Sequence, residues 1–269
     1  MKNTYLSNEE KYKYLNKINK FYKYDSDIIK FFMNKNIKIF EDGSNNKKQK
    51  LTKSEIESLF ILSKKTIKFM DDFSIDYWLD GGSLLGAMRN GKMIKWDDDI
   101  DLAIVEDQYI KLIEIIKKIG IKEDKHYIFK KYDIKFRLVY SKDAVSNSLK
   151  EWLIRAEHLT NNNKILFIDL ISYIKNNKNQ YVTNNIYFNK TYIYNISDIY
   201  PLRKIKLENQ YFKCVNNPLP YLNKGYWFWY HLGRVTHTHF NNNTNIDKNS
   251  YFKLNLNEKI LEHIQKIVK

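Results

Sequence analysis

Cysteine is nearly absent from this sequence of 269 residues, since Cys214 is the only one. A single cysteine cannot form an intrachain disulfide, and it excludes a zinc site built from several thiolates. Long apolar runs are also missing: no stretch approaches the roughly 20 apolar residues that span a bilayer. The first 24 residues lack the unbroken apolar core of a secretory signal. We therefore expect a soluble, cytoplasmic protein without a membrane span.

Acidic residues are outnumbered by basic ones, with 31 Asp and Glu against 46 Lys and Arg and a formal net charge of +15. Such a balance favours polyanionic partners, which include nucleic acid, an anionic membrane surface and phosphorylated small molecules. A surface of solvated lysines explains the same balance, so the charge alone selects no partner. The length and the 43% hydrophobic content are those of a globular protein with a buried core.

Hydrophobic periodicity indicates a mixture of helices and strands. A capping box at Thr52 and Glu55 begins a helix predicted over 53–72, and another helix is predicted over 106–119. Further helical segments are expected within 1–50, over 219–230 and from about 252. Apolar alternation predicts strands over 75–79, 99–105, 134–140 and 165–171. The predicted fold class is α+β, a mixed β-sheet flanked by helices with additional N- and C-terminal helical segments.

The densest chemistry lies in residues 78–104, which read WLDGGSLLGAMRNGKMIKWDDDIDLAI. Residues two apart on a strand share a face, so Asp97, Asp99 and Asp101 are expected on one side of an apolar strand. Carboxylates this close repel one another unless a cation lies among them, and Mg²⁺ or Mn²⁺ prefers such oxygen ligands. The alternative is an acidic surface turn, but unpaired charge entering an apolar strand is costly. We therefore predict a divalent-cation site.

A glycine turn precedes these carboxylates. Gly81 and Gly82 follow a predicted strand, and Ser83 is predicted to cap a short helix over 84–89 that Gly91 ends. A glycine turn at a helix start lets backbone amides approach an anion closely. We expect Gly81, Gly82 and Ser83 to bind phosphate oxygens of a substrate whose other oxygens the cation holds.

Residues 78–104 resemble the signature of the LicD and fukutin-related family, approximately W-L-x-G-G-[ST]-L-L-G-A-x-R and then I-P-W-D-x-D-x-D. Lys95 stands in the place of the proline, and Asn90 stands where histidine is common. Weaker similarity at FIDL (167–170), YPLRKIKL (200–207) and 217–226 extends the resemblance over about 53–230. The resemblance implies a nucleotidyltransferase-like catalytic domain over 51–230, between an N-terminal extension (1–50) and a C-terminal extension (231–269).

The resemblance also implies an activity. Family members move a phospho-alcohol group, such as phosphocholine or ribitol phosphate, from a CDP-activated donor to a sugar hydroxyl, and a phosphodiester results. Asp99, Asp101 and Asp169 would then hold the Mg²⁺ or Mn²⁺, and Asp169 or Asp97 would accept the proton of the hydroxyl. Arg89 matches the family arginine and would bind a substrate phosphate, although a cation at a helix C-terminus explains it too.

Other residues have competing interpretations. Arg137, in the middle of a predicted strand, either faces the substrate cleft or is an exposed strand arginine. The histidines of 231–239 could ligate zinc, but too few ligands accompany them, so ordinary polar residues are expected. The aromatic residues of 226–230 could stack on a base or sugar, but we expect them in an apolar core.

Two alternative functions involve the same features of the chain. A nucleotidyltransferase that transfers NMP from an NTP would use the same carboxylates and would release pyrophosphate rather than CMP. A non-catalytic module would bind nucleic acid through its basic surface, with affinity that falls steeply with salt. Clustered carboxylates repel phosphates, so we do not expect nucleic acid as the partner. The expected partners are a CDP-alcohol donor and a glycan or sugar acceptor.

Overall fold

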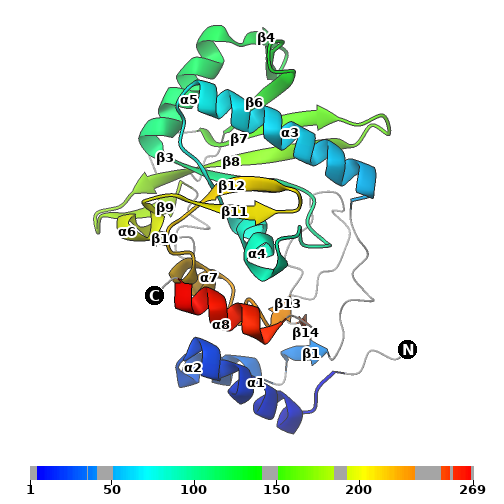
Figure 1. Ribbon diagram of the computed structural model, residues 1–269, viewed down its shortest axis with the longest axis vertical. Coiled ribbons are helices and arrows are strands. Elements are labelled where there is room, and N and C mark those ends of the chain that lie inside the picture. The colour runs from blue at the N-terminus through cyan, green and yellow to red at the C-terminus, as the bar shows by residue number, and fades with distance from the viewer. Residues whose placement is uncertain are drawn as a thin grey trace. The chain divides into compact units, whose positions relative to one another are not determined.

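The computed structural model describes residues 5–34, 36–40, 51–140, 151–184, 193–233, 250–254 and 257–267. The chain divides into two units, of which one spans Leu51–Tyr221 and the other joins Met1–Lys50 to Leu222–Lys269. Both units combine helices with strands (Figure 1), which confirms the α+β class predicted from the sequence.

A mixed β-sheet is the centre of the Leu51–Tyr221 unit (Figure 1). Along most of the sheet neighbouring strands are antiparallel, in the spatial order β10 (Ile193–Asn195), β9 (Gln180–Thr183), β8 (Ile165–Lys175), β7 (Glu151–Leu159), β6 (Ile134–Tyr140), β5 (His126–Phe129) and β4 (Ile121–Glu123). β3 (Ile100–Val105) also pairs with β8, in parallel, and the short β2 (Trp78–Leu79) pairs antiparallel with β3. The segment that carries the clustered aspartates therefore continues into β3, a strand with a paired neighbour on each side.

The sheet has an apolar face and a charged face. On β6, Ile134, Phe136 and Leu138 are buried, whereas the residues between them are partly exposed. Helix α3 (Lys53–Asp72) packs on the apolar face, where the rings of Phe69 and Phe136 lie 5.1 Å apart. This packing leaves the charged side chains of β6, β7 and β8 on the opposite face.

The other elements of this unit are helices and one hairpin: α4 (Gly81–Asn90), α5 (Glu106–Ile119), α6 (Ile196–Ile199), β11 (Arg203–Leu207) and β12 (Gln210–Cys214). The predictions for 53–72 and 106–119 are confirmed at both ends. The reciprocal bonds between Thr52 and Glu55 form the capping box of α3, and α5 ends at Gly120.

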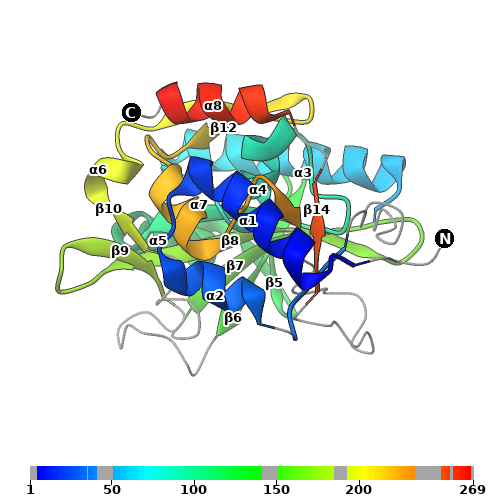
Figure 2. The same cartoon turned by 90° about the horizontal axis from the view of Figure 1, so that it is seen from below.

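The second unit packs its helices around aromatic side chains. Its elements are α1 (Asn8–Tyr22), α2 (Ser26–Met33), β1 (Lys38–Phe40), β13 (Leu232–Gly233), β14 (Ser250–Lys253) and α8 (Glu258–Ile267), and α7 (Leu219–Gly225) ends in it (Figure 2). The ring of Phe228 meets those of Tyr22 and Phe32, each with about edge-to-face geometry. Phe228, Trp229 and Tyr230 are buried, as expected for core residues.

Several sequence predictions of element bounds are wrong. The helix predicted over 219–230 ends at Gly225, and Phe228 adopts the left-handed region with φ of 54°. The last helix begins at Glu258 rather than near 252, because 250–253 form β14, which pairs in parallel with β1. The strand predicted over 75–79 is reduced to Trp78–Leu79. The β1–β14 pairing joins segments about 200 residues apart, and local periodicity carries no information about it.

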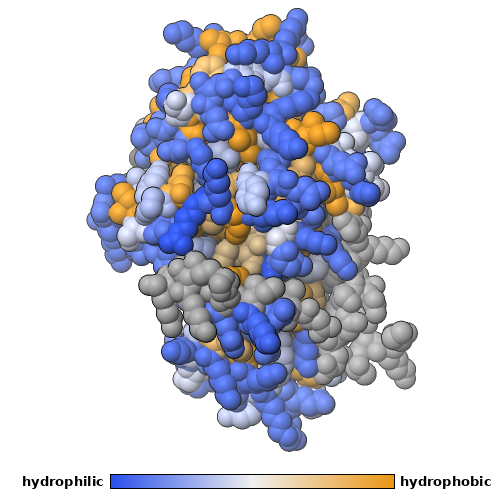
Figure 3. Space-filling model, in the orientation of Figure 1, coloured by the Kyte–Doolittle hydropathy of each residue, from blue (hydrophilic) through white to orange (hydrophobic). Residues whose placement is uncertain are grey.

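The surface is predominantly hydrophilic on the face that Figure 3 shows, and apolar residues occur there in small separate groups. Some large apolar side chains are exposed, among them Ile110, Ile119 and Ile121. Among the described residues, none of the helices has both the length and the apolar character that a membrane span requires.

Candidate functional site

Three carboxylates converge at the start of β3, one each from β3, from β8 and from the residue that precedes β3. In the parallel pairing of β3 with β8, Asp101 lies directly opposite Asp169, so their side chains share the charged face. Asp99 immediately precedes β3, whose Ile100, Leu102 and Ile104 are fully buried. Asp99, Asp101 and Asp169 each offer a carboxylate oxygen, and these oxygens lie within 4.8 Å of one another. We call these three residues the carboxylate cluster.

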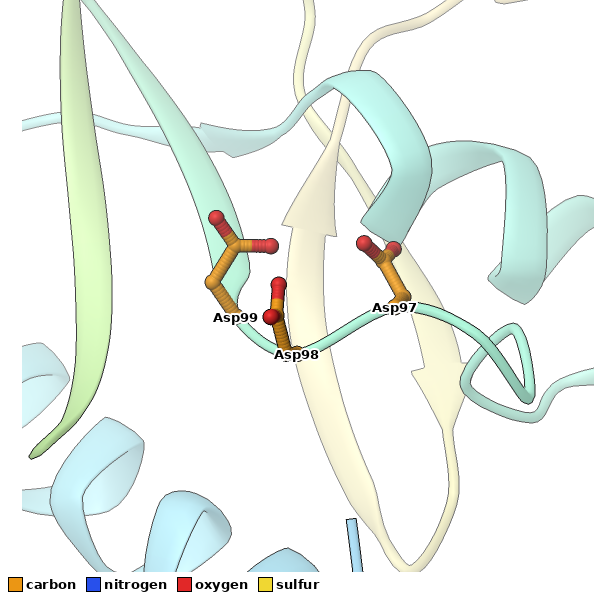
Figure 4. A group of neighbouring side chains, drawn as sticks. All are labelled: Asp97, Asp98 and Asp99. Carbon is orange, nitrogen blue, oxygen red and sulfur yellow. The ribbon is translucent and has the colours of Figure 1, made fainter. Parts of the chain in front are cut away.

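A second group overlaps the carboxylate cluster through Asp99. Asp97, Asp98 and Asp99 also offer oxygens within 4.8 Å of one another, and Figure 4 shows them on the segment that leads into β3. Asp98 and Asp99 are buried, whereas Asp97 is partly exposed, so Asp97 is accessible to solvent. Asp97 lies before the strand rather than on it, because β3 begins only at Ile100. The sequence prediction did not include Asp98.

Burial and mutual repulsion act on the cluster together. Burial, followed by the charges of the neighbouring aspartates, raises the pKa of Asp99 and the pKa of Asp101 well above their usual range. A backbone hydrogen bond from Gly82 opposes the rise for Asp101. A divalent cation would relieve both effects, and a donor set made only of carboxylate oxygens suits Mg²⁺ or Mn²⁺ rather than a softer metal. The residues present therefore fit the predicted ion.

The glycine turn lies against these carboxylates. Gly81 has φ of 51°, and a Cβ at Gly81 would collide with the Asp101 carboxylate, as one at Gly82 would with that of Asp97. The amide of Gly81 donates to the Tyr221 hydroxyl at 3.2 Å. Gly81 is therefore required by its positive φ and by the Asp101 carboxylate together, whereas a side chain at Gly82 would displace the carboxylate of Asp97. That their amides also bind phosphate remains a prediction.

Helix α4 begins differently from the sequence prediction. It starts at Gly81, and Ser83 lies inside it, so Ser83 is not its N-cap. The Ser83 hydroxyl instead accepts the backbone N–H of Asp101 at 3.0 Å, which ties α4 to β3. The end of the helix at Gly91, with φ of 70°, is confirmed. Ser83 thus positions Asp101, and its contact with phosphate remains a prediction.

Asp80 holds the glycine turn in place through buried hydrogen bonds. It is fully buried and accepts hydrogen bonds from the hydroxyls of Tyr173 (2.7 Å) and Tyr194 (3.1 Å). Burial raises the pKa of Asp80, and the hydrogen bonds from these tyrosines and Tyr221 oppose that rise. Because Asp80 precedes Gly81 directly, this network holds the start of α4 in place. The aspartate of the WLDGG motif is the signal for this network in the sequence, although no role was predicted for it.

Arg155 is the principal site residue that the sequence analysis missed. It lies on β7 opposite Asp169, and its Nε and Nη2 donate to the two Asp169 oxygens at 2.7 and 2.8 Å. Its guanidinium also stacks over the Phe167 ring, 3.9 Å from the centroid. The charged residues at 155 and 157, among apolar residues of β7, were the signal in the sequence. A carboxylate oxygen carries two lone pairs, so a carboxylate that accepts from an arginine can also be a ligand of a cation.

The other arginines and the histidines considered in the sequence lie in different parts of the structure. Arg137 lies on β6, on the charged face, and its Nε is 2.8 Å from Oε1 of the buried Glu157. Arg89 is buried in the last turn of α4, about 12 Å along the helix from Gly81. His231 is buried in the other unit, and burial lowers its pKa to about 4. The histidines at 237 and 239 lie outside the described residues.

Comparison with known proteins agrees with this geometry. The sequence model of a family described as LicD/FKTN/FKRP, nucleotidyltransferase domain, matches residues 74–217, which is more than half of the chain and contains the whole carboxylate cluster. An uncharacterised protein of Rickettsia prowazekii is 25% identical over 189 residues, which are 68% of this chain and 59% of that protein. The human ribitol 5-phosphate transferase FKRP is 45% identical over 42 residues, 16% of this chain and 8% of FKRP. The lipopolysaccharide cholinephosphotransferase LicD of Haemophilus influenzae is 42% identical over 43 residues, 16% of each chain. The chain thus spans less than two thirds of each of these relatives.

Proposed function

The chain belongs to the LicD/FKTN/FKRP family, and on that premise we propose that it transfers a phospho-alcohol group from a CDP-activated donor to a sugar hydroxyl of a glycan. The group transferred would be phosphocholine, ribitol phosphate or a similar alcohol phosphate, in line with the names of two relatives. The observation that supports the proposal is the convergence of Asp99, Asp101 and Asp169 within 4.8 Å, inside the region that the family model matches.

The aspartates of the site have different proposed roles in this reaction. Asp99, Asp101 and Asp169 would hold Mg²⁺ or Mn²⁺, and the bound ion would neutralise charge that develops on the leaving CMP. Asp97 is the proposed acceptor of the hydroxyl proton, because it is partly exposed and lies beside the cluster. Asp169 is less suited to that role, because both of its oxygens already accept charge-assisted hydrogen bonds from Arg155.

The rest of the site orients these groups. Ser83 fixes the backbone of Asp101, and the network around Asp80 fixes the glycine turn against the Asp101 and Asp97 carboxylates. Most of the rate enhancement of phosphoryl transfer comes from positioning and electrostatic stabilisation. A rigid setting for the carboxylates is therefore what this chemistry needs.

Incubation of the protein with Mn²⁺, a glycan acceptor and either a CDP-alcohol or CTP tests the proposal. We expect CMP release from CDP-choline or CDP-ribitol, and loss of at least 100-fold in rate on Asp99→Asn. The exposed Asp124, in the turn between β4 and β5, offers a matched control, since Asp124→Asn should leave the rate unchanged. Pyrophosphate release from CTP with no CMP release from either CDP-alcohol would instead establish a nucleotidyltransferase.

A further inference from the structure

A row of charged side chains crosses the sheet away from the carboxylate cluster. Asp101 on β3 pairs with Asp169 on β8, Asp169 with Arg155 on β7, Arg155 with Arg137 on β6, and Arg137 with His126 on β5. Residues directly opposite on neighbouring strands project from the same face, so all five lie on the face opposite α3. The sign of the charge changes from negative to positive between β8 and β7.

The two arginines of the row are fixed by buried acids. Arg155 is held by both oxygens of Asp169, and its side chain is 16% exposed. Glu157, with a side chain 4% exposed, lies 2.8 Å from Nε of Arg137 and 2.8 Å from Nε2 of His126. Each guanidinium therefore lies against a buried carboxylate, Arg155 through two hydrogen bonds and Arg137 through an ion pair, and contacts of this kind orient the groups of a binding site.

Each guanidinium retains donors beyond these contacts. A guanidinium carries five N–H groups, of which Arg155 donates two to Asp169, whereas Arg137 forms an ion pair with Glu157 in which its Nε makes no hydrogen bond. Within the described part of the chain, no acceptor meets the remaining N–H groups of either arginine. The two backbones are one strand spacing apart, about 5 Å, and like charges directly opposite each other reduce stability. An oxyanion between the two guanidinium groups would attract both of them, and because it lies closer to each than they lie to one another, this attraction would outweigh their repulsion.

We propose that Arg155 and Arg137 form an anion subsite for phosphate oxygens of the substrate, next to the carboxylate cluster. Arg155 connects the anion subsite to the carboxylate cluster, because Asp169, to which it donates, is also a member of that cluster. Guanidinium groups suit this task, since their planar donors match phosphate oxygens in pairs. The inference rests on the proposed function in one respect: the phosphate belongs to a phosphoryl-transfer substrate, as the diphosphate of the donor or as a phosphate of the acceptor.

Titration calorimetry with CDP, with and without Mn²⁺, and Mn²⁺ binding followed by electron paramagnetic resonance test the subsite. We expect Arg155→Gln and Arg137→Gln each to weaken CDP or phosphate binding about 10- to 100-fold, as for lost hydrogen bonds to a charged group. Arg155→Gln should bind Mn²⁺ alone at least as tightly as the wild type, because a cation is removed from beside the ligands. Arg203→Gln removes an exposed arginine bonded to Asn216 and should change none of these affinities.

The source of the phosphate follows from a second titration. Inorganic phosphate is added to protein saturated with Mn²⁺ and CDP: exclusion of phosphate assigns the subsite to the donor diphosphate, and additional binding that Arg137→Gln removes assigns it to the acceptor. Wild-type affinity for both anions in both arginine variants would overturn the subsite. Loss of Mn²⁺ together with CDP in Arg155→Gln would overturn it as well, because Arg155 would then only orient Asp169.

Two further comparisons keep the outcomes separate. Arg155→Lys keeps one positive charge beside Asp169 but not the paired donors, so it should fold like the wild type and still bind CDP more weakly. If no CDP-alcohol is turned over but the arginine variants lose anion binding, the subsite stands and the proposed function fails. If turnover is observed and the variants bind both anions normally, the proposed function stands and the subsite fails.

Discussion

Replacement of Asp99 by asparagine should stabilise the metal-free protein while it removes the metal site. Oxygens of Asp99, Asp101 and Asp169 lie within 4.8 Å of one another, and two unit charges at that distance repel by about 3.5 kcal/mol at an effective dielectric constant of 20. Proton uptake limits the total cost at pH 7, because an aspartate with an ordinary pKa near 3.9 is protonated for about 4 kcal/mol. We therefore expect Asp99→Asn to raise the free energy of unfolding by about 1 to 3 kcal/mol in EDTA.

Equilibrium denaturation in EDTA and in saturating Mn²⁺, at several pH values, measures this effect. Since the pKa of Asp99 is raised in the folded state, folding takes up a proton, and the wild type without metal should gain stability as the pH falls from 7 toward 4. That gain should be smaller in Asp99→Asn. Mn²⁺ at 100 times its Kd should add about 2.7 kcal/mol to the wild type and little to the variant. A variant that is less stable than the wild type in EDTA and keeps its Mn²⁺ response would refute the reasoning, provided that Asp124→Asn behaves as wild type.

Three further substitutions test the glycine turn and the second unit. Gly81→Ala should lower the free energy of unfolding by about 1–3 kcal/mol and weaken Mn²⁺ binding in a metal titration, because a Cβ meets the Asp101 carboxylate at positive φ. Gly91→Ala shares the left-handed backbone but meets only the Lys206 carbonyl at 3.5 Å, so it should lose about 1 kcal/mol and keep Mn²⁺ affinity. His231 has a pKa lowered to about 4 by burial, so the unfolded state binds its proton first and stability should fall by up to about 3 kcal/mol from pH 7 to pH 4. His231→Gln should flatten that profile in pH-dependent denaturation, and an unchanged slope would contradict the assignment.

Elements with local signals could be predicted from the sequence. The capping box at Thr52 and the glycine at 120 mark ends of α3 and α5 that the structure confirms. The alternation over 134–140 gives β6 with its correct bounds. The LicD family could also be predicted, because its motif lies in 27 consecutive residues, and the match of the family model confirms it. Failures occurred where distant segments decide the structure, as where β14 pairs with β1.

The start of α4 shows how tertiary contacts override a local capping signal. Ser83 is a good N-cap by type, yet the backbone N–H of Asp101 takes its hydroxyl. Asp80 occupies the N-cap position instead without a side-chain cap, because its carboxylate accepts tyrosine hydroxyls from β8 and β10. Neither contact could be derived without the positions of the partner strands, and two of these, β8 and β10, begin more than 70 residues after the end of α4.

The arginines of the charged row illustrate the same limit within the site itself. Alternation places Arg137 on one face of β6 and Arg155 on one face of β7, but a shift of one residue in the register would reverse either face. Only the pairing of Arg155 with both Asp169 and Arg137 puts the two guanidinium groups beside the carboxylates. The aspartates of the site could therefore be predicted from the sequence, because they are close along the chain or lie in a family motif. The counter-charges come from a different pair of strands, and their role becomes visible only in the assembled sheet.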